Sequence, residues 1–244
     1  MKIRVGTSGY NYAAWKGSFY PADLSAAKML PYYSSRFGTV EINATFYRLP
    51  TAKTLAGWDA ATPSDFVLAL KAPQRITHFA RLRGIDDPLR FFCDTALTLG
   101  PKLGPLLFQL PPNFKKDTDR LAATLSLLPS DLSCAFEFRH DSWLAADVYD
   151  LLRRRNAALC IADSASASTP LIATADFGYF RLRDEGYTDA NLGRWAETIR
   201  ELGGSWREAF VYFKHEEAGT GPAFARCRRR SAADRRCREG ARSG

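Results

Sequence analysis

The sequence predicts one α/β domain folded as a (β/α)8 TIM-type barrel. Eight short apolar runs recur along the chain, amphipathic or loop segments separate them, and the chain has 244 residues. Alternating strands and helices form parallel sheets, and about 250 residues is typical of eight such units. The alternative is an open, doubly wound sheet. No Gly-x-Gly-x-x-Gly follows the first apolar run, which weakens the dinucleotide-binding form of that alternative.

The predicted strands are short segments rich in Val, Ile, Leu, Phe and Tyr. They cover residues 3–8, 39–43, 66–71, 105–110, 133–139, 157–163, 177–183 and 209–214. Apolar residues at helical spacing predict helices over residues 23–37, 86–99, 117–128, 143–155 and 189–202. Asp87-Pro88 is a favourable start for the second of these helices, because proline is well tolerated in a first helical turn.

Two segments fit the barrel less well. Residues 164–176 are rich in Ser, Ala and Thr, so we expect a short or irregular sixth crossover there. After Gly221-Pro222 the chain offers Phe224 as its one large apolar residue, which predicts a poorly packed end. We therefore predict a single barrel domain over residues 1–225 and a frayed or disordered Arg-rich tail over residues 226–244.

The positive charge of the chain is concentrated in this tail. Residues 226–244 hold eight arginines against one Asp and one Glu, a net charge of +6 out of +8 for the whole chain. Residues 1–225 therefore carry only +2. An isoelectric argument for nucleic-acid binding by the barrel itself is weakened accordingly.

The cysteines and the apolar runs indicate where the protein resides. Five cysteines is an odd number, and none of them form a Cys-x-x-Cys zinc pattern. No run approaches the roughly 18 apolar residues of a membrane span, and the first residues lack the apolar stretch of a secretory signal. We expect a cytoplasmic protein without a membrane partner.

Side-chain parity along the strands predicts the position of a site. Successive side chains of a strand point to opposite faces, so the bulky residues can be assigned to the helical layer and their neighbours to the barrel interior. This assignment turns the following residues inward: Gly6, Ser8, Glu41, Asn43, Lys71, Gln109, Glu137, Arg139, Asp163, Arg181 and Lys214. They lie near the C-terminal ends of their strands, where the active sites of this fold are built.

The inward ring predicts either a binding site or a structural network. Three carboxylates, Glu41, Glu137 and Asp163, face four cations, and buried charges at this density need partners. One hypothesis is a set of salt bridges that serves the fold alone. The other is a pocket whose positive excess receives an anionic ligand.

Aromatic and glycine-containing loops flank the predicted ring. Tyr10, Tyr12, Trp15, Phe46 and Tyr47 follow the first two strands and can either stack on a base or sugar or pack as a lid over the barrel. After the last strand, residues 219–221 form a Gly-x-Gly. This is either a phosphate-binding turn or a tight surface turn.

The three histidines each follow a strand closely. His78, His140 and His215 could share a divalent metal ion with nearby carboxylates, although none has the spacing of known zinc motifs. General acid–base work by His140 or His215 is the simpler hypothesis. We assign no metal ligands and expect no cofactor, with a divalent metal as the alternative.

Five phrases of the sequence together resemble the YecE-like family, catalogued as domain of unknown function 72. They are GTSGY (6–10), TVEINATFYR (39–48), ITH (76–78), KLGPLLFQLPP (102–112) and FEFRHDSW (136–143). The resemblance runs from residue 3 to about residue 225 and implies a TIM-type barrel. It implies no established reaction, although likeness in architecture to metal-dependent endonucleases and sugar isomerases has suggested nucleic-acid or phosphosugar chemistry.

The chain departs from the family pattern after two strands. Arg181-Leu182-Arg183 stands where the family often has Arg-Leu-His, which weakens a metal site at that position. Lys214-His215-Glu216-Glu217 stands where many members have Asn-Asn-Asp, and it resembles a second variant that is followed by Gly-Pro.

These observations lead to one main functional hypothesis. We expect a barrel enzyme, of the hydrolase or isomerase class, that acts on a phosphate-bearing or otherwise anionic small substrate. The expected catalytic residues are Glu41, Glu137, His140 and Asp163. The expected substrate-binding residues are Tyr10, Asn43, Phe46, Tyr47, Lys71, His78, Gln109, Arg139, Trp143, Arg181 and Lys214. One alternative is a non-catalytic nucleic-acid-binding protein that uses the basic tail and the aromatic loops. The other is a divalent-metal-dependent hydrolase resembling a barrel nuclease.

Overall fold

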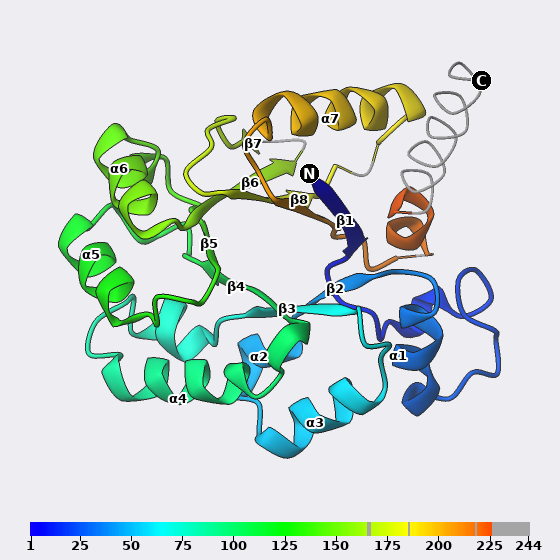
Figure 1. Ribbon diagram of the computed structural model, residues 1–244. Helices are drawn as coiled ribbons and strands as arrows, with labels where there is room; N and C mark the ends of the chain where they lie inside the picture. The colour runs from blue at the N-terminus through cyan, green and yellow to red at the C-terminus, as the bar shows by residue number, and fades with distance from the viewer. Residues whose placement is uncertain (165–166, 185, 218, 226–244) are drawn as a thin grey trace, which may run out of the picture.

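The computed structural model describes residues 1–164, 167–184, 186–217 and 219–225, and these residues form the predicted (β/α)8 barrel. Eight parallel strands pair in the order β1-β9-β8-β6-β5-β4-β3-β2, with the helices outside the ring (Figure 1). The strands are β1 (Lys2–Thr7), β2 (Thr39–Ile42), β3 (Val67–Lys71), β4 (Leu103–Gln109), β5 (Cys134–Glu137), β6 (Ala158–Ser164), β8 (Phe177–Leu182) and β9 (Glu208–Phe213).

The ring is nearly closed by a contact between β1 and β2. Ser8 and Glu41 form a parallel bridge, and the Gly9 N–H donates to the Glu41 carbonyl oxygen at 2.8 Å. Gly6 permits this approach, because a Cβ atom at that position would lie 2.2 Å from the Thr39 carbonyl oxygen. A residue with a side chain at position 6 would push these two strands apart.

The helices cover the outside of the strands, and several begin with a side chain that caps their free N–H groups. The helices are α1 (Ala26–Ser34), α2 (Ala44–Tyr47), α3 (Ala52–Ala60), α4 (Asp86–Leu97), α5 (Thr118–Leu127), α6 (Ala146–Arg155) and α7 (Asp189–Leu202). Asp117 caps α5 by accepting from the Arg120 N–H, and Thr188 with Asn191 forms a capping box on α7. The predicted helices agree with α1, α4, α5, α6 and α7, whereas α2 and α3 lie in segments for which no helix was predicted.

The sixth crossover is irregular, as predicted. Strand β7 (Ala167–Ser168) pairs antiparallel with β6, and the described residues between β7 and β8 contain no helix. Thr174 ties this segment to the barrel, because its hydroxyl accepts from the Leu159 N–H and donates to the Ala157 carbonyl oxygen, both at 2.7 Å.

The core has two layers that follow the parity of the strands. Inside the barrel lie Val67, Ala69, Leu107, Ala135, Ala158, Cys160, Phe177, Tyr179, Phe210 and Tyr212. The alternate positions, such as Leu68, Leu70 and Phe108, belong to the larger cluster between the strands and the helices. The inward direction predicted for Lys71, Gln109, Glu137, Arg181 and Lys214 is therefore confirmed, since each shares the parity of interior residues.

The end of the described chain is packed against the barrel. Residues 220–225 are helical, and the Phe224 ring lies 5.6 Å from the Tyr187 ring and 5.8 Å from the Phe213 ring, centroid to centroid. The predictions made for residues 226–244, a frayed tail and a possible nucleic-acid contact, lie outside the described residues. So do Cys227 and Cys237, whereas Cys93, Cys134 and Cys160 are buried free thiols.

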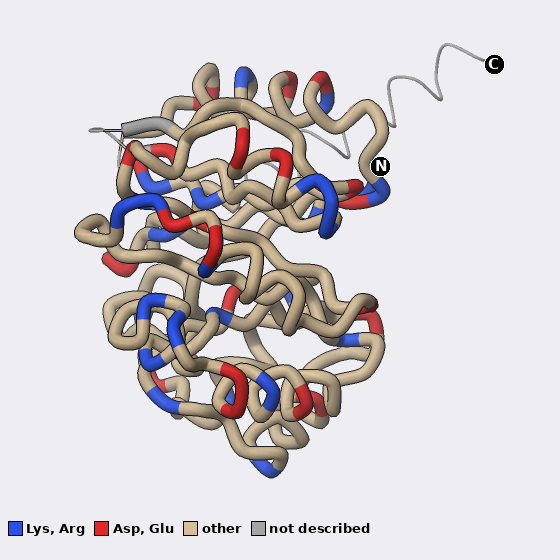
Figure 2. The backbone as a smooth tube through the Cα atoms, turned by 90° about the vertical axis from the view of Figure 1, so that its left-hand side faces the viewer, with Lys and Arg blue, Asp and Glu red and all other residues tan. Residues whose placement is uncertain are grey.

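Two further features bear on the partners that were predicted. Within the described ranges, no helix is both long enough and apolar enough to cross a membrane. Figure 2 shows acidic and basic positions interleaved over the face turned to the viewer, which agrees with the small net charge of residues 1–225.

Candidate functional site

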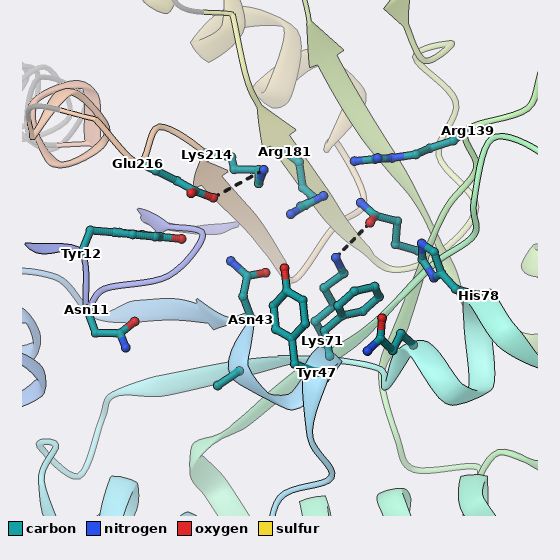
Figure 3. A pocket seen from close by; sticks show the side chains of 14 residues that line it. Asn11, Tyr12, Asn43, Tyr47, Lys71, His78, Arg139, Arg181, Lys214 and Glu216 are labelled. Atoms are coloured by element: carbon teal, nitrogen blue, oxygen red, sulfur yellow. Dashed lines mark hydrogen bonds and ion pairs between the residues drawn. The ribbon is translucent and has the colours of Figure 1, made fainter. Parts of the chain in front are cut away.

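A cavity of about 600 Å³ opens at the C-terminal ends of the strands. Its lining residues come from the ends of β3, β4 and β8 and from the segments that follow β1, β2, β3, β5 and β9. They are Asn11, Tyr12, Asn43, Ala44, Phe46, Tyr47, Lys71, Gln74, His78, Gln109, Arg139, Arg181, Lys214 and Glu216. Figure 3 shows Tyr12 and Glu216 on one side of this cavity and His78 and Arg139 on the other. The cavity occupies the place that the sequence predicted for a site.

Arg181 forms the floor of the cavity and is fully paired with two carboxylates. Its Nη2 lies 2.9 Å from Oε1 of Glu41, and its Nη1 lies 2.5 Å from Oε2 of Glu137. All three side chains are completely or almost completely buried. Ser8 and Tyr179 complete the shell around Glu41, since each donates its hydroxyl to that carboxylate.

Glu137 is the most heavily contacted carboxylate of the site. Besides Arg181, it accepts from Gln109 Nε2 at 2.8 Å and from Arg139 Nε at 3.1 Å, and Arg183 Nη2 lies 3.4 Å away. Burial alone would raise the pKa of Glu137, but the three guanidinium groups outweigh burial and hold this pKa well below its usual range. Glu137 is therefore a permanent anion in the folded protein.

Lys71 faces the same cavity and, within the part of the chain that the structure describes, forms no ion pair with a carboxylate. Its Nζ donates to Gln109 Oε1 at 2.9 Å and lies 3.8 Å from the centroid of the Phe46 ring. Burial and, after it, the nearby Arg181 charge lower the pKa of Lys71 to about 7. Near neutral pH the amine is thus divided between its charged and its uncharged form.

His78 lies beside Lys71 and stays uncharged near neutral pH. Burial, with Lys71 and Arg139 as further causes, lowers the pKa of His78 to about 4. Its Nδ1 is 2.9 Å from the Thr77 hydroxyl, and its ring meets the Phe46 ring edge to face. The imidazole consequently adds hydrogen-bonding capacity to the cavity but no charge.

The remaining cations lie higher on the cavity wall. Arg139 is one-third exposed and uses its Nε for Glu137, and among the described residues its two terminal nitrogens have no hydrogen-bond partner. Lys214 Nζ is 3.6 Å from Oε1 of Glu216, an exposed and weak ion pair. These two side chains are the most available for binding an anion.

The cavity brings together nine of the residues that the sequence predicted for the site. They are Asn43, Phe46, Tyr47, Lys71, His78, Gln109, Arg139, Arg181 and Lys214. Glu41 and Glu137 lie directly beneath them. The ring therefore contains both features that the sequence had offered as alternatives. Its lower layer, with Glu41 and Glu137, forms salt bridges, and its upper layer lines an open cavity.

Three other predicted residues, Tyr10, His140 and Trp143, do not line the cavity. Tyr10 is half-buried against Tyr33. His140 caps a short 3-10 turn, since its Nδ1 accepts from the Ser142 N–H at 3.1 Å. Trp143 is completely buried, stacks on Phe138 and donates its indole N–H to the Phe114 carbonyl oxygen.

The inward direction predicted for Asp163 is wrong. Ala158 and Cys160 fill the barrel interior, so Asp163 shares the outward parity of Leu159 and Ile161. Its carboxylate accepts from the Tyr187 hydroxyl and the Trp195 indole N–H, and it borders a separate cavity beside α7. Leu159 and Ile161, which alternate with Asp163 on the same face of the strand, are bulky, and their size could have assigned Asp163 to the outward face.

Several lining residues were absent from the predicted site. Four of them lie on segments that follow strands: Asn11, Tyr12, Gln74 and Glu216. In such segments the side chains do not alternate regularly between two faces, so their direction cannot be predicted from the sequence. Arg183 contacts Glu137 without lining the cavity; it has the parity of Arg181 and could have been predicted from it. Of the predicted aromatic residues, Tyr12, Phe46 and Tyr47 line the cavity, whereas Trp15 is packed in the core.

The described residues do not form a metal centre or a recognisable phosphate turn. Within the described part of the chain, no three His, Cys, Asp or Glu side chains come together to hold a metal ion. The three histidines are separated, and His215 Nε2 lies 2.8 Å from the Asp184 carbonyl oxygen. Gly219 has a φ of +74° and packs against Ser18, so the Gly-x-Gly serves a close chain contact.

A family model described as "Protein of unknown function DUF72" matches residues 4–241. The protein YunF of Bacillus subtilis is 33% identical over 156 residues, which are 61% of this chain and 54% of YunF. The protein YecE of Escherichia coli K12 is 33% identical over 114 residues, 46% of this chain and 42% of YecE. The aligned regions thus span about half the length of these relatives.

Solved structures resemble the whole barrel. A DUF72 family protein from Thermotoga maritima superposes with a TM-score of 0.83 at 25% identity, covering 96% of this chain and 100% of that one. A DUF72 family protein from Enterococcus faecalis gives a TM-score of 0.77 at 18% identity, with 92% and 93% coverage. The second likeness concerns the fold alone.

Proposed function

Since the chain belongs to the DUF72 family of barrel proteins, we propose that it is an enzyme whose C-terminal cavity binds a small anionic substrate, a phosphate ester or a carboxylate. The observation that carries this proposal is the charge of the cavity wall. Lys71, Arg139, Arg181 and Lys214 line it, opposed by the carboxylate of Glu216. The two carboxylates beneath neutralise Arg181, so the positive potential of the open volume comes from Arg139, Lys214 and the charged form of Lys71.

Arg139 and Lys214 are the proposed anion ligands. The terminal nitrogens of Arg139 can approach a phosphate or carboxylate group as a bidentate fork, which is the geometry that guanidinium groups favour. Lys214 would exchange its weak contact with Glu216 for the ligand. Asn11, Asn43 and Gln74 supply amide groups on the same wall for hydroxyl or carbonyl groups of the substrate.

Glu41 and Glu137 act in this proposal as positioning residues. Each is completely buried and accepts several hydrogen bonds, and the lowered pKa of Glu137 leaves it no proton to give near neutral pH. They fix the guanidinium of Arg181, whose charge then points at the cavity without having to reorganise. In this proposal neither Glu41 nor Glu137 transfers a proton, and that role belongs to groups on the cavity wall.

The other predicted functions have less support. The nucleic-acid hypothesis used the aromatic loops together with the basic tail, residues 226–244, which lie outside the described residues. The metal-dependent hydrolase lacks a donor set in the part of the chain that the structure describes. The anionic small molecule is the ligand that the cavity residues favour.

Calorimetric titration of the full chain with inorganic phosphate, glycerol 3-phosphate and lactate tests the proposal. We expect at least one anion to bind and Arg139→Met to weaken that binding about tenfold or more. Arg90→Met is the matched control, because this arginine is exposed on α4 and should leave the affinity unchanged. Absence of binding by all three anions, or equal binding by Arg139→Met and the wild type, would overturn the proposal.

A further inference from the structure

Lys71 differs from every other basic side chain of the cavity in what surrounds its charge. Arg181 and Arg139 contact Glu137, and Lys214 contacts Glu216. Lys71 is only 8% exposed, and among the described residues it has no carboxylate within ion-pair distance. Glu41 and Glu137 act on Lys71 only at longer range, so burial of this amine costs folding free energy that no direct ion pair among the described residues offsets.

The neighbours of Lys71 hold its Nζ in one position. Gln109 Oε1 accepts from Nζ at 2.9 Å, while the other end of the same amide donates to Glu137 at 2.8 Å. Glu137 therefore decides which end of the amide faces Lys71. The Phe46 ring, 3.8 Å from Nζ, covers another side of the amine, so that its remaining open side is the cavity.

The uncharged form of this amine is accessible under ordinary conditions. Burial and the Arg181 charge bring the pKa of Lys71 to about 7, whereas a solvent-exposed lysine has a pKa of about 10.4. An uncharged amine is a nucleophile, and burial beside another cation is an established way to activate a lysine. The adjacent His78 has a pKa of about 4, so its uncharged ring does not attract the anionic group of a ligand away from Arg139 and Lys214.

We propose that Lys71 is a nucleophilic amine that forms an imine with a carbonyl compound whose anionic group is bound by Arg139 and Lys214. The inference rests on the proposed function, because the anion site is what brings the carbonyl carbon to Nζ. It narrows the substrate class to keto or aldehyde compounds that carry a carboxylate or phosphate, such as 2-oxo acids and phosphorylated ketoses.

The step balances without an oxidant or a reductant. The Nζ lone pair attacks the carbonyl carbon, the C=O π electrons move to oxygen, and this oxygen takes up a proton to give a carbinolamine. The nitrogen then loses one proton, and the hydroxyl group leaves as water after a second protonation while the nitrogen lone pair forms the C=N bond. Loss of the second nitrogen proton gives the neutral imine. Amine and carbonyl compound thus give imine and water.

Reductive trapping tests the inference. The full chain is incubated with pyruvate, glyoxylate or dihydroxyacetone phosphate and sodium cyanoborohydride, and the adduct is located by peptide mass spectrometry. We expect one dominant adduct at Lys71, lost in both Lys71→Arg and Lys71→Met. Lys53→Met, which removes an exposed lysine of α3, should keep the adduct. Acetone, which has no charge, should require at least tenfold higher concentration.

The pH profile and a non-carbonyl anion separate the possible outcomes. Trapping should increase with pH as the amine loses its proton, with a midpoint at or above pH 7, because the bound anionic group stabilises the charged amine. If lactate binds in an Arg139-dependent manner but no carbonyl compound labels Lys71 above the exposed lysines, the imine is wrong and the anion site stands. If neither lactate nor any carbonyl compound binds, the proposed function falls as well.

Discussion

Arg181 and Lys71 are neighbouring cations of one cavity, and they differ in whether carboxylates accompany them. Arg181 is enclosed by Glu41 and Glu137 and is saturated with charged partners. Lys71 has an amide and an aromatic ring beside its Nζ. The floor of the cavity therefore holds a fixed charge that carboxylates stabilise, whereas Lys71 on its wall has a pKa lowered to about 7.

The largest expected loss of folding stability comes from removing Arg181 at the floor of the cavity. Arg181→Met leaves Glu41 and Glu137 buried with fewer positive partners, and we expect it to lower the free energy of unfolding by about 3–5 kcal/mol. Arg139→Met should cost less than about 1 kcal/mol, because that side chain is one-third exposed. Urea unfolding measures both. Similar losses for the two variants would contradict the contrast between floor and wall.

Glu137→Gln should produce the next largest loss, about 2–4 kcal/mol near pH 7, because Arg139, Arg181 and Arg183 then lose a common anion. The lowered pKa of Glu137 means that its stabilisation is present above the ordinary pKa of a glutamate and is lost as the pH falls toward the folded-state value. Unfolding of both proteins between pH 7 and pH 3 should show the difference shrinking on acidification. A difference independent of pH would contradict this role.

Lys71→Met should have a smaller effect of opposite sign. Because the folded state lowers the pKa of Lys71 to about 7, its charge is unfavourable below that pH, and we expect the variant to be about 1–2 kcal/mol more stable there. The gain should shrink as the pH rises above 7 and vanish above about 10.4, the ordinary pKa of a lysine, where the amine is neutral in both states. Thermal unfolding across this range checks the sign, and destabilisation at pH 6 would contradict it.

Tyr47→Ala should have the smallest effect on folding. This ring lies on the cavity rim and is 74% exposed, so we expect a change within about 0.5 kcal/mol in urea unfolding. A loss of several kcal/mol would mean that the rim, like the floor, belongs to the structural part of the site.

The barrel and the level of its site could be predicted from the sequence because parity and strand length are local properties. Residues such as Lys71, Gln109 and Glu137 follow interior residues by two positions, and the alternation carries their direction. The same rule, applied to the bulk of Leu159 and Ile161, would have turned Asp163 outward. The error came from preferring an inward carboxylate to the packing of its neighbours.

The pairing of charges could not be predicted, because it is decided between distant strands. No local sequence pattern indicates that Glu41 and Glu137 both form ion pairs with Arg181, or that Lys71 donates its hydrogen bond to Gln109. The lining residues Asn11 and Gln74 could not be predicted either, because they lie outside the strands and side-chain alternation applies only within strands. Sequence alone therefore locates the ring, and the structure shows which of its charged members are paired with one another.

The pKa of Lys71, measured by NMR titration of isotope-labelled lysines with and without phosphate, tests the central claim most directly. Lys71→Arg assigns the signal. We predict a midpoint near pH 7 in the free protein, moving to higher pH when phosphate binds, because a bound anion stabilises the charged amine. A midpoint near that of the exposed lysines, unchanged by phosphate, would contradict the claim that this wall holds an unpaired amine beside an anion site.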